Sequence, residues 1–449
     1  MSRPVVALVG RTNVGKSTLL NRIVGQRHAV VDDQPNVTRD RLFVPVSWGG
    51  RDMIVVDTGG WGADAETPMD AKVKRQAELA VAQADLILLV VSALDGTIPS
   101  DEEVAALVRS AGKTAILVVN KVDTSRHEAL AADFHGLGIE TVLAVSAIHN
   151  HGVSDLMDQV VDMLPPPVEE VEPDPDSVRI AIVGRPNAGK STLLNALLGD
   201  ERAIVDSTPG TTRDSLDAGL KWQDKHIVLV DTAGIRKRTR VPFGIDYFSV
   251  LRSMQAIDRC DVALLVLDAE EPATGQDVTI ARYVLDSGKG LVLVVNKWDR
   301  IPKEYKETHK NWLARRLEFF SYVPVIHTSA LEGRNVKLAL QRAIEVWKAR
   351  GKRLSRSAVD AAVQAAVERH APHKVANRRL NIIWAHQDED SPWTFVLHVN
   401  DPKLVPPTYE RYLEHQLRQE FGFRGVPLHF VFVKAGKPRR KQEVSDWRA

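Results

Sequence analysis

Two glycine-rich strings have the composition and spacing of a phosphate-binding loop. Each has the pattern GxxxxGK[ST], and each stands between an apolar run and a helical pattern, which is the setting that a P-loop requires. The glycines let backbone N–H groups wrap phosphate oxygens, and the start of the helix adds positive potential. We expect Lys16 and Lys190 to neutralise the β- and γ-phosphates, and Ser17 and Ser191 to ligate Mg²⁺. The strings are Gly10, Arg11, Thr12, Asn13, Val14, Gly15, Lys16 and Ser17, and Gly184, Arg185, Pro186, Asn187, Ala188, Gly189, Lys190 and Ser191.

A second pair of strings, of the form DTxG, ends an apolar run downstream of each P-loop. Alone, such a string is an ordinary strand and turn, but after a P-loop it indicates a switch. Its Asp reaches the Mg²⁺ shell through water, and the N–H of its last Gly contacts a γ-phosphate. Lys16, Gly60, Lys190 and Gly234 are therefore candidates for catalysis. With the residue that follows, the strings are Asp57, Thr58, Gly59, Gly60 and Trp61, and Asp231, Thr232, Ala233, Gly234 and Ile235.

Two further pairs of strings identify the base as guanine. A carboxylate at the end of NKxD accepts hydrogen bonds from guanine N1–H and N2–H₂, an arrangement that adenine lacks, so the site rejects ATP. The lysine lies along the ring face, and a later Ser-Ala pair suits a backbone contact to guanine O6. These residues are Asn120, Lys121, Asp123, Ser146 and Ala147 in the first copy, and Asn296, Lys297, Asp299, Ser329 and Ala330 in the second.

The two sets of motifs belong to a duplicated domain. Residues 5–40 align with 179–214 at an offset of 174, with 20 identities in 36 positions. The offset grows to 176 at Asn120 and Asn296, and to 183 at Ser146 and Ser329, as loop insertions would produce. Within each copy, short apolar runs alternate with helical patterns, which predicts an α/β fold with a mostly parallel sheet and helices on both faces. In the first copy the expected strands are Val5–Val9, Met53–Val56, Leu86–Val91 and Ala115–Val119, and the expected helices Ser17–Val24 and Val104–Ser110.

The last third has a different pattern, which predicts a small α+β unit of order αββαβ. Its elements are expected at Ser357–Arg369, Leu380–Ala385, Thr394–Val399, Pro407–Phe421 and Leu428–Val433. The acidic, proline-rich segment between the copies indicates an extended linker. The predicted division is a first nucleotide-binding domain at 1–164, a linker at 165–177, a second nucleotide-binding domain at 178–350, the α+β domain at 351–436 and a basic tail at 437–449.

Composition and charge exclude several classes of protein. Of 449 residues, 44% are hydrophobic and 26% charged, which excludes wholesale disorder. One cysteine, Cys260, excludes a disulfide framework and a Cys-based zinc site, and it is expected to be buried. No apolar run reaches bilayer length and no signal peptide is apparent, so we expect a cytoplasmic protein without stable membrane insertion. The formal net charge is +1, but residues 348–449 carry 19 Lys or Arg against 11 Asp or Glu. That excess fits either a polyanion partner or a solvated basic surface.

The motifs together make the chain resemble the P-loop GTPases and, more narrowly, the Der (EngA) family of tandem-domain ribosome-assembly GTPases. Supporting strings are Pro209-Gly210-Thr211-Thr212-Arg213-Asp214 and Tyr409-Glu410-Arg411-Tyr412-Leu413. The resemblance implies two GTPase domains and a KH-like C-terminal domain. It also implies that Thr38 and Thr212 bind Mg²⁺ from switch I and take part in catalysis. Asn36 departs from the family's usual Gly, which stands at Gly210.

The residue after each DTxG string is unusual for a GTPase. Ras-like enzymes place a Gln there to orient the attacking water, whereas this chain has Trp61 and Ile235. The resemblance implies that K⁺ compensates, bound by Asn13 and Asn187. The alternative is that these asparagines only stabilise a turn.

The resemblance implies a K⁺-stimulated GTPase that acts in assembly of the large ribosomal subunit. Its partners would be that subunit or its precursor and rRNA, with no DNA partner and with the chain a monomer. Two other functions remain open: an RNA-binding scaffold that uses GTP structurally, and an MnmE-like cation-dependent GTPase in tRNA modification. Gly422-Phe423-Arg424-Gly425 matches the GxxG clamp of KH domains. It lies between a helix and a strand rather than between two helices, so a helix cap and turn is expected instead.

Overall fold

The apolar runs of the first copy form buried strands of one sheet. A computed structural model describes residues 3–25, 43–57, 78, 81–124, 132–166, 177–199, 204–205, 217–222, 224–232, 245–372, 374–375 and 378–435. In the first copy the strands pair in the order β2-β3-β1-β4-β5-β6. All pairs are parallel except β2–β3, an antiparallel hairpin at the edge. The strands are β1 (Val5–Val9), β2 (Phe43–Trp48), β3 (Arg51–Asp57), β4 (Leu86–Ser92), β5 (Ala115–Asn120) and β6 (Thr141–Ala144).

Helices follow the strands of this sheet, as parallel pairing requires. They are α1 (Lys16–Val24), α3 (Pro99–Ser110) and α5 (Val153–Met163), with a 3-10 turn η2 (Ala132–Leu137). The helix expected at Val104–Ser110 begins five residues earlier, because Pro99 stands in its first turn and is followed by Asp101 and Glu102. A proline and carboxylates favour the start of a helix.

The second copy repeats the fold with one more strand. Its strands pair in the order β13-β12-β11-β7-β10-β9-β8, with β9 antiparallel to both neighbours. The chain consists of two compact units, Met1–Pro173 and Asp174–Ala449, and this sheet belongs to the second. The strands are β7 (Ser177–Val183), β8 (Ile204–Val205), β9 (Ala218–Trp222), β10 (Lys225–Val230), β11 (Val262–Asp268), β12 (Gly290–Asn296) and β13 (Val325–His327).

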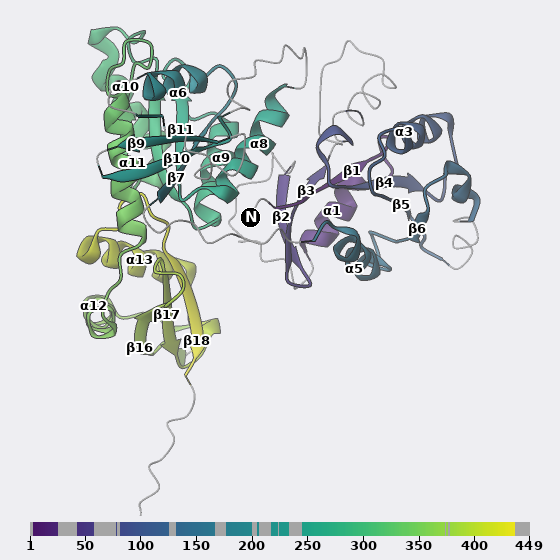
Figure 1. Ribbon diagram of the computed structural model, residues 1–449. Helices are drawn as coiled ribbons and strands as arrows, with labels where there is room; N and C mark the ends of the chain where they lie inside the picture. Colours follow the sequence, from purple (N-terminus) through teal and green to yellow (C-terminus); the bar gives the residue numbers. More distant parts are fainter. Residues whose placement is uncertain are drawn as a thin grey trace, which may run out of the picture. The chain divides into compact units, whose positions relative to one another are not determined.

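Helices flank the second sheet (Figure 1). Ile180 and Ile182 of β7 share a buried cluster with leucines of α6 and α11, while α8 and α9 pack with one another and against β7 and β11. The helices and 3-10 turns are α6 (Lys190–Leu198), α8 (Ile245–Arg259), α9 (Gly275–Asp286), η3 (Lys303–Tyr305), α10 (Lys306–Arg316), η4 (Glu318–Phe320) and α11 (Val336–Arg350).

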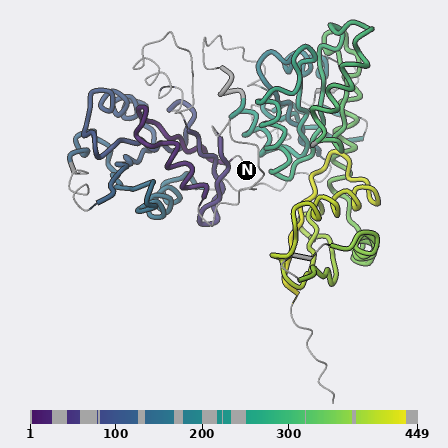
Figure 2. The backbone as a smooth tube through the Cα atoms, turned by 180° about the vertical axis from the view of Figure 1, so that it is seen from behind, coloured from purple at the N-terminus to yellow at the C-terminus, as the bar shows by residue number. Residues whose placement is uncertain are grey.

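The C-terminal third forms the expected α+β domain and shares a core with the sheet of the second copy. The buried cluster that includes residues of β7 and α6 continues through α11 into this domain. Figure 2 shows the backbone running directly from the second copy into the C-terminal domain, which is coloured yellow-green. In its three-stranded sheet, β17 lies between antiparallel β16 and parallel β18. The elements are α12 (Arg356–Arg369), β14 (Lys374–Val375), β15 (Arg378–Arg379), β16 (Ile382–Gln387), β17 (Thr394–Val399), η5 (Pro402–Leu404), α13 (Pro407–Phe421) and β18 (His429–Lys434).

The element types expected from sequence are confirmed in all three domains. Each strand expected in the first copy lies within an observed strand, and the observed C-terminal order contains the expected αββαβ. The elements for which the sequence predicted no range include β2, β6, the short β14–β15 pair and helix α10. Among the described residues, no helix is long and apolar enough to cross a membrane.

Candidate functional site

Each P-loop is a tight turn between a buried strand and a helix. In the first copy, between β1 and α1, the backbone is left-handed at Gly10 (φ 145°), Asn13 (φ 64°) and Gly15 (φ 98°). A Cβ at Gly10 would lie 2.3 Å from the carbonyl oxygen of Val90, so this position requires glycine. The second copy repeats these angles within 5° at Gly184, Asn187 and Gly189.

The P-loop lysines are folded into this turn. Nζ of Lys16 donates to the carbonyl oxygens of Gly10 and Arg11, each at 2.6 Å. Lys190 makes the matching hydrogen bonds at 2.6 and 2.7 Å. Burial lowers the pKa of each lysine to about 8, and at Lys16 the charge of Asp57 partly opposes that shift. An ammonium group that has lost its hydration is stabilised by an anion such as a phosphate.

The arginine at the second position of each P-loop contacts the loop that follows the neighbouring strand of the sheet, β4 in the first copy and β11 in the second. Arg11 pairs with Asp95, and its Nε lies 3.8 Å from Asp101. Arg185 donates from Nη1 to the Glu271 carboxylate at 2.5 Å and from Nη2 to the Glu271 carbonyl oxygen at 2.9 Å. Sequence reasoning missed these acidic partners, which lie 84 and 86 residues from their arginines and in no motif.

Two of the expected Mg²⁺ ligands lie together in the first copy. The hydroxyl of Ser17 at the start of α1 donates to Oδ2 of Asp57 at the end of β3, at 2.6 Å. A hydroxyl beside a carboxylate supplies the oxygen donors that Mg²⁺ prefers. In the second copy Ser191 is the second residue of α6, and Asp231 directly follows β10 with φ 57°.

A buried asparagine joins the phosphate loop to the base-recognition loops. Nδ2 of Asn120 donates to the carbonyl of Val14 at 2.8 Å, and its Oδ1 accepts from the N–H of Ala147 at 3.1 Å. Asn296 makes both bonds in the second copy, to Ala188 and from Ala330, at 3.0 Å each. Both asparagines are 2% exposed. The first residue of NKxD therefore fixes three motifs relative to one another.

The carboxylates expected to recognise guanine are held by the serines of the Ser-Ala pairs. Ser146 Oγ donates to Oδ1 of Asp123 at 2.5 Å. Asp299 accepts a hydrogen bond from Ser329, which holds the pKa of that carboxyl below its usual range. Oδ1 of Asp299 is shielded from solvent and has no hydrogen-bond partner among the described residues. A donor such as guanine N1–H would satisfy this oxygen.

The lysine of each NKxD string has a left-handed backbone, with φ 67° at Lys121 and 63° at Lys297. Nζ of Lys297 lies 2.5 Å from Oδ2 of Asp268, the last residue of β11. This ion pair holds the lysine over the end of the sheet, where the P-loop also begins.

Nine of the expected site residues lie outside the described residues. They are Thr38, Thr58, Gly59, Gly60, Trp61, Thr212, Ala233, Gly234 and Ile235. Thr12 and Pro186 lie within the P-loop turns, and Thr232 directly follows Asp231. In each copy, the expected site residues that the structure does describe lie at the carboxyl ends of the central strands.

The GxxG string of the C-terminal domain forms a turn that contacts the second nucleotide-binding domain. Gly425 has φ 75°, donates to the carbonyl of Tyr322 at 2.9 Å and accepts from the N–H of Leu291 at 2.8 Å. A Cβ there would meet Val346 at 2.5 Å. The string therefore packs against the second nucleotide-binding domain, and the expectation that it is a turn is confirmed.

Comparisons with known proteins give the same architecture. The family described as "50S ribosome-binding GTPase" matches residues 5–121 and 179–297. The "KH-domain-like of EngA bacterial GTPase enzymes, C-terminal" matches residues 353–432. The GTPase Der of Pelotomaculum thermopropionicum is 44% identical over 97% of this chain and all of its own. That of Symbiobacterium thermophilum is 44% identical over 96% of this chain and 92% of its own.

Proposed function

This chain belongs to the GTPase Der family and hydrolyses GTP, and from that premise we propose that hydrolysis acts as a switch in assembly of the large ribosomal subunit. The observation that carries the proposal is the buried Asn120 and Asn296, which join the phosphate, guanine and Ser-Ala loops in both copies. Two such sites in one chain allow two nucleotides to control a single association.

We propose the nucleotide-binding roles given by the motifs. Lys16 and Lys190 neutralise the phosphates, and Asp123 and Asp299 read guanine. Bound Mg²⁺ would neutralise the charge on the phosphate oxygens, held by Ser17, Thr38 and Asp57 and by Ser191, Thr212 and Asp231. The proposed domain limits are 1–164, 178–350 and 351–436, and the proposed location is the cytoplasm.

The P-loop lysines predict a pH dependence of nucleotide binding. Their pKa of about 8 should rise when an anionic phosphate replaces lost hydration, so binding near pH 8 takes up protons. Affinity should fall as pH increases above 8, because a neutral lysine must then be protonated on binding. Calorimetry in two buffers of different ionisation enthalpy measures the uptake. Lys190→Met should remove the proton uptake that accompanies nucleotide binding at the second site. Proton release on binding by the parent protein would contradict the prediction.

We propose that Asn13 and Asn187 also bind K⁺. Both side chains are exposed at the P-loop turn, where an amide oxygen is open to a cation beside the phosphates. Replacing K⁺ by Na⁺ should slow hydrolysis several-fold. Asn13→Gly together with Asn187→Gly keeps the left-handed turn but removes the amide oxygens, so it should abolish the difference. If the glycine variant keeps the K⁺ preference, the asparagines serve only the turn.

The test of the proposed switch is co-sedimentation with large ribosomal subunits. The full chain with a non-hydrolysable GTP analogue is compared with the full chain in GDP. Different association in the two states is expected. Equal association would favour the RNA-binding scaffold over the switch.

A further inference from the structure

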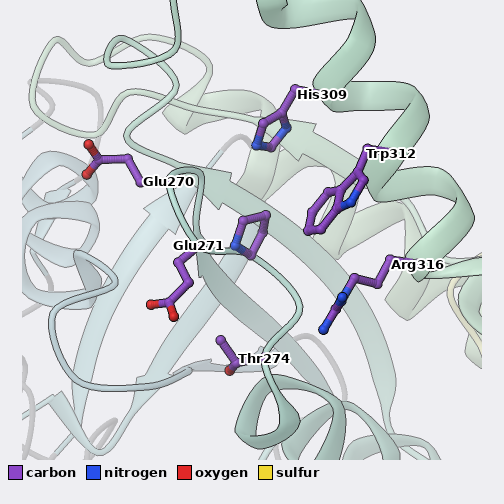
Figure 3. A pocket seen from close by; sticks show the side chains of 7 residues that line it. Glu270, Glu271, Thr274, His309, Trp312 and Arg316 are labelled. Atoms are coloured by element: carbon purple, nitrogen blue, oxygen red, sulfur yellow. The ribbon is translucent and has the colours of Figure 1, made fainter.

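A hollow of about 440 Å³ lies between α10 and the loop that follows β11 in the second GTPase domain. Figure 3 shows His309, Trp312 and Arg316 projecting from the helix toward Glu270 and Glu271 of the loop. Its volume falls within the range of about 300–1,000 Å³ that small ligands occupy in proteins. None of these side chains except Glu271 belongs to the contacts that hold the phosphate loop, so the hollow is a separate site.

The wall formed by α10 belongs to the second copy. The segment from residue 300 to 328 is seven residues longer than the equivalent segment from 124 to 145. In the described part of the first copy, residues 132–137 form only the short turn η2. The first copy carries the complete guanine motif without this extra length, so α10 serves another purpose.

The hollow offers an aromatic face with hydrogen-bond donors and acceptors around it. Trp312 is 44% exposed, and the guanidinium carbon of Arg316 lies 5.4 Å from its ring centre. Nε of Arg316 donates to the carbonyl of Ala273 at 3.1 Å, a bond that leaves both terminal amino groups able to donate. The carboxylates of Glu270 and Glu271 point away from the hollow (Figure 3), toward Arg300 and Arg185, whereas Thr274, which lines the hollow, carries a hydroxyl acceptor. An unpaired RNA base is bound in this way, by stacking on an aromatic ring and by bonds to its polar edge.

Charge around the hollow favours a polyanion. The segment 300–328 holds six Lys or Arg and three Asp or Glu, whereas the segment 124–145 holds one and three. Arg315 of α10, which directly precedes Arg316 of the hollow, is exposed. The negative charge of Glu270 and Glu271 at its border disfavours a phosphate there, so the backbone would follow the basic helix while the base enters.

We propose that this hollow binds one unpaired base of a single-stranded RNA, stacked on Trp312. Arg316 hydrogen-bonds the edge of the base, and the basic residues of α10 contact the phosphates. The inference rests on the proposed function only in identifying that RNA as ribosomal.

The hollow also touches the nucleotide site through its loop. Glu271 holds Arg185 of the P-loop at 2.5 Å, and Asp268 holds Lys297 of NKxD at 2.5 Å. His309 Nε2 lies 2.7 Å from the carbonyl oxygen of Ala269 in the same loop. A base that contacts this loop should change guanine nucleotide affinity at the second site, and by linkage the nucleotide should change RNA affinity by the same factor.

The test measures binding of a short fluorescein-labelled single-stranded RNA to the full chain by anisotropy. Trp312→Ala should weaken binding by about fivefold or more, because one stacked base contributes that much. Trp312→Phe should restore most of it. Tyr305→Ala is the matched control, since this exposed aromatic residue lies outside the hollow. The same RNA annealed to its complement should bind parent and Trp312→Ala equally, because its bases are paired.

Three outcomes would overturn the proposal: unchanged binding in Trp312→Ala, an equal loss in Tyr305→Ala, or an equal loss for the duplex. Guanine nucleotide binding by Trp312→Ala serves as the check of folding. Failure of the proposed switch is distinguishable, because it appears as equal subunit association in both nucleotide states. If subunit association is equal in both nucleotide states but Trp312→Ala still loses RNA binding, the hollow binds RNA and the proposed switch is wrong.

Discussion

Asp299→Asn is expected to lower GTP affinity at the second site by roughly 5- to 150-fold while improving binding of xanthosine triphosphate. A bidentate contact to a base edge is worth about 1–3 kcal/mol. The amide that replaces the carboxylate can accept only through oxygen, so the contact to guanine N1–H and N2–H₂ is halved. Xanthine carries a carbonyl at C2 in place of the amino group, and the amide N–H₂ can donate to it.

The contacts around Asp299 sharpen this expectation. Its Oδ1 is shielded and has no partner among the described residues, so it is poised for an incoming donor. Ser329 hydrogen-bonds the carboxylate and keeps its pKa low, so the group stays ionised at neutral pH. Competition between GTP and xanthosine triphosphate for a fluorescent nucleotide measures the change.

Asp123→Asn is the matched variant for the first site. It should shift the preference there and leave the second site as in the parent protein. Equal affinity of the parent protein for GTP and ATP would contradict the assignment of both carboxylates. A xanthosine preference at both sites after a single substitution would mean that the copies do not read bases independently.

The sequence predicted the strands and the nucleotide motifs because both depend on local pattern. A strand buried on both faces, such as β4, is a continuous apolar run, and the P-loop needs its glycines at fixed spacing. The edge strand β2 was missed because it is half-buried and follows no strict alternation.

Contacts between distant residues could not be predicted in this way. Asp95 and Glu271 become partners of the P-loop arginines only because parallel strands bring their loops together. The role of Gly425 likewise depends on the domain that it packs against, and its GxxG string carries no sign of that surface. The motif gave Asn120 a place in base recognition, whereas the structure shows it joining three loops.

Gly15→Ala is expected to lower nucleotide affinity at the first site by roughly 100-fold or more. The Cβ would lie 2.3 Å from Nδ2 of Asn120. That side chain is fixed at both ends, by Val14 and by Ala147, so it cannot yield without breaking a buried hydrogen bond. Leaving a buried polar group unpaired costs about 1–3 kcal/mol, and a left-handed non-glycine residue adds about 1–2 kcal/mol.

The structure supplies a control variant and a double-mutant cycle with Asn120 for this prediction. Gly112 also has a positive φ, 61°, but a Cβ there would meet nothing within 4 Å, so Gly112→Ala carries backbone strain without the clash. It should leave nucleotide affinity within about twofold, since it lies outside the site. In Asn120→Ala the obstructing amide is absent, so adding Gly15→Ala should cost much less than it does in the parent protein. Additive losses in that double mutant, measured by nucleotide titration, would mean that the asparagine does not constrain the glycine.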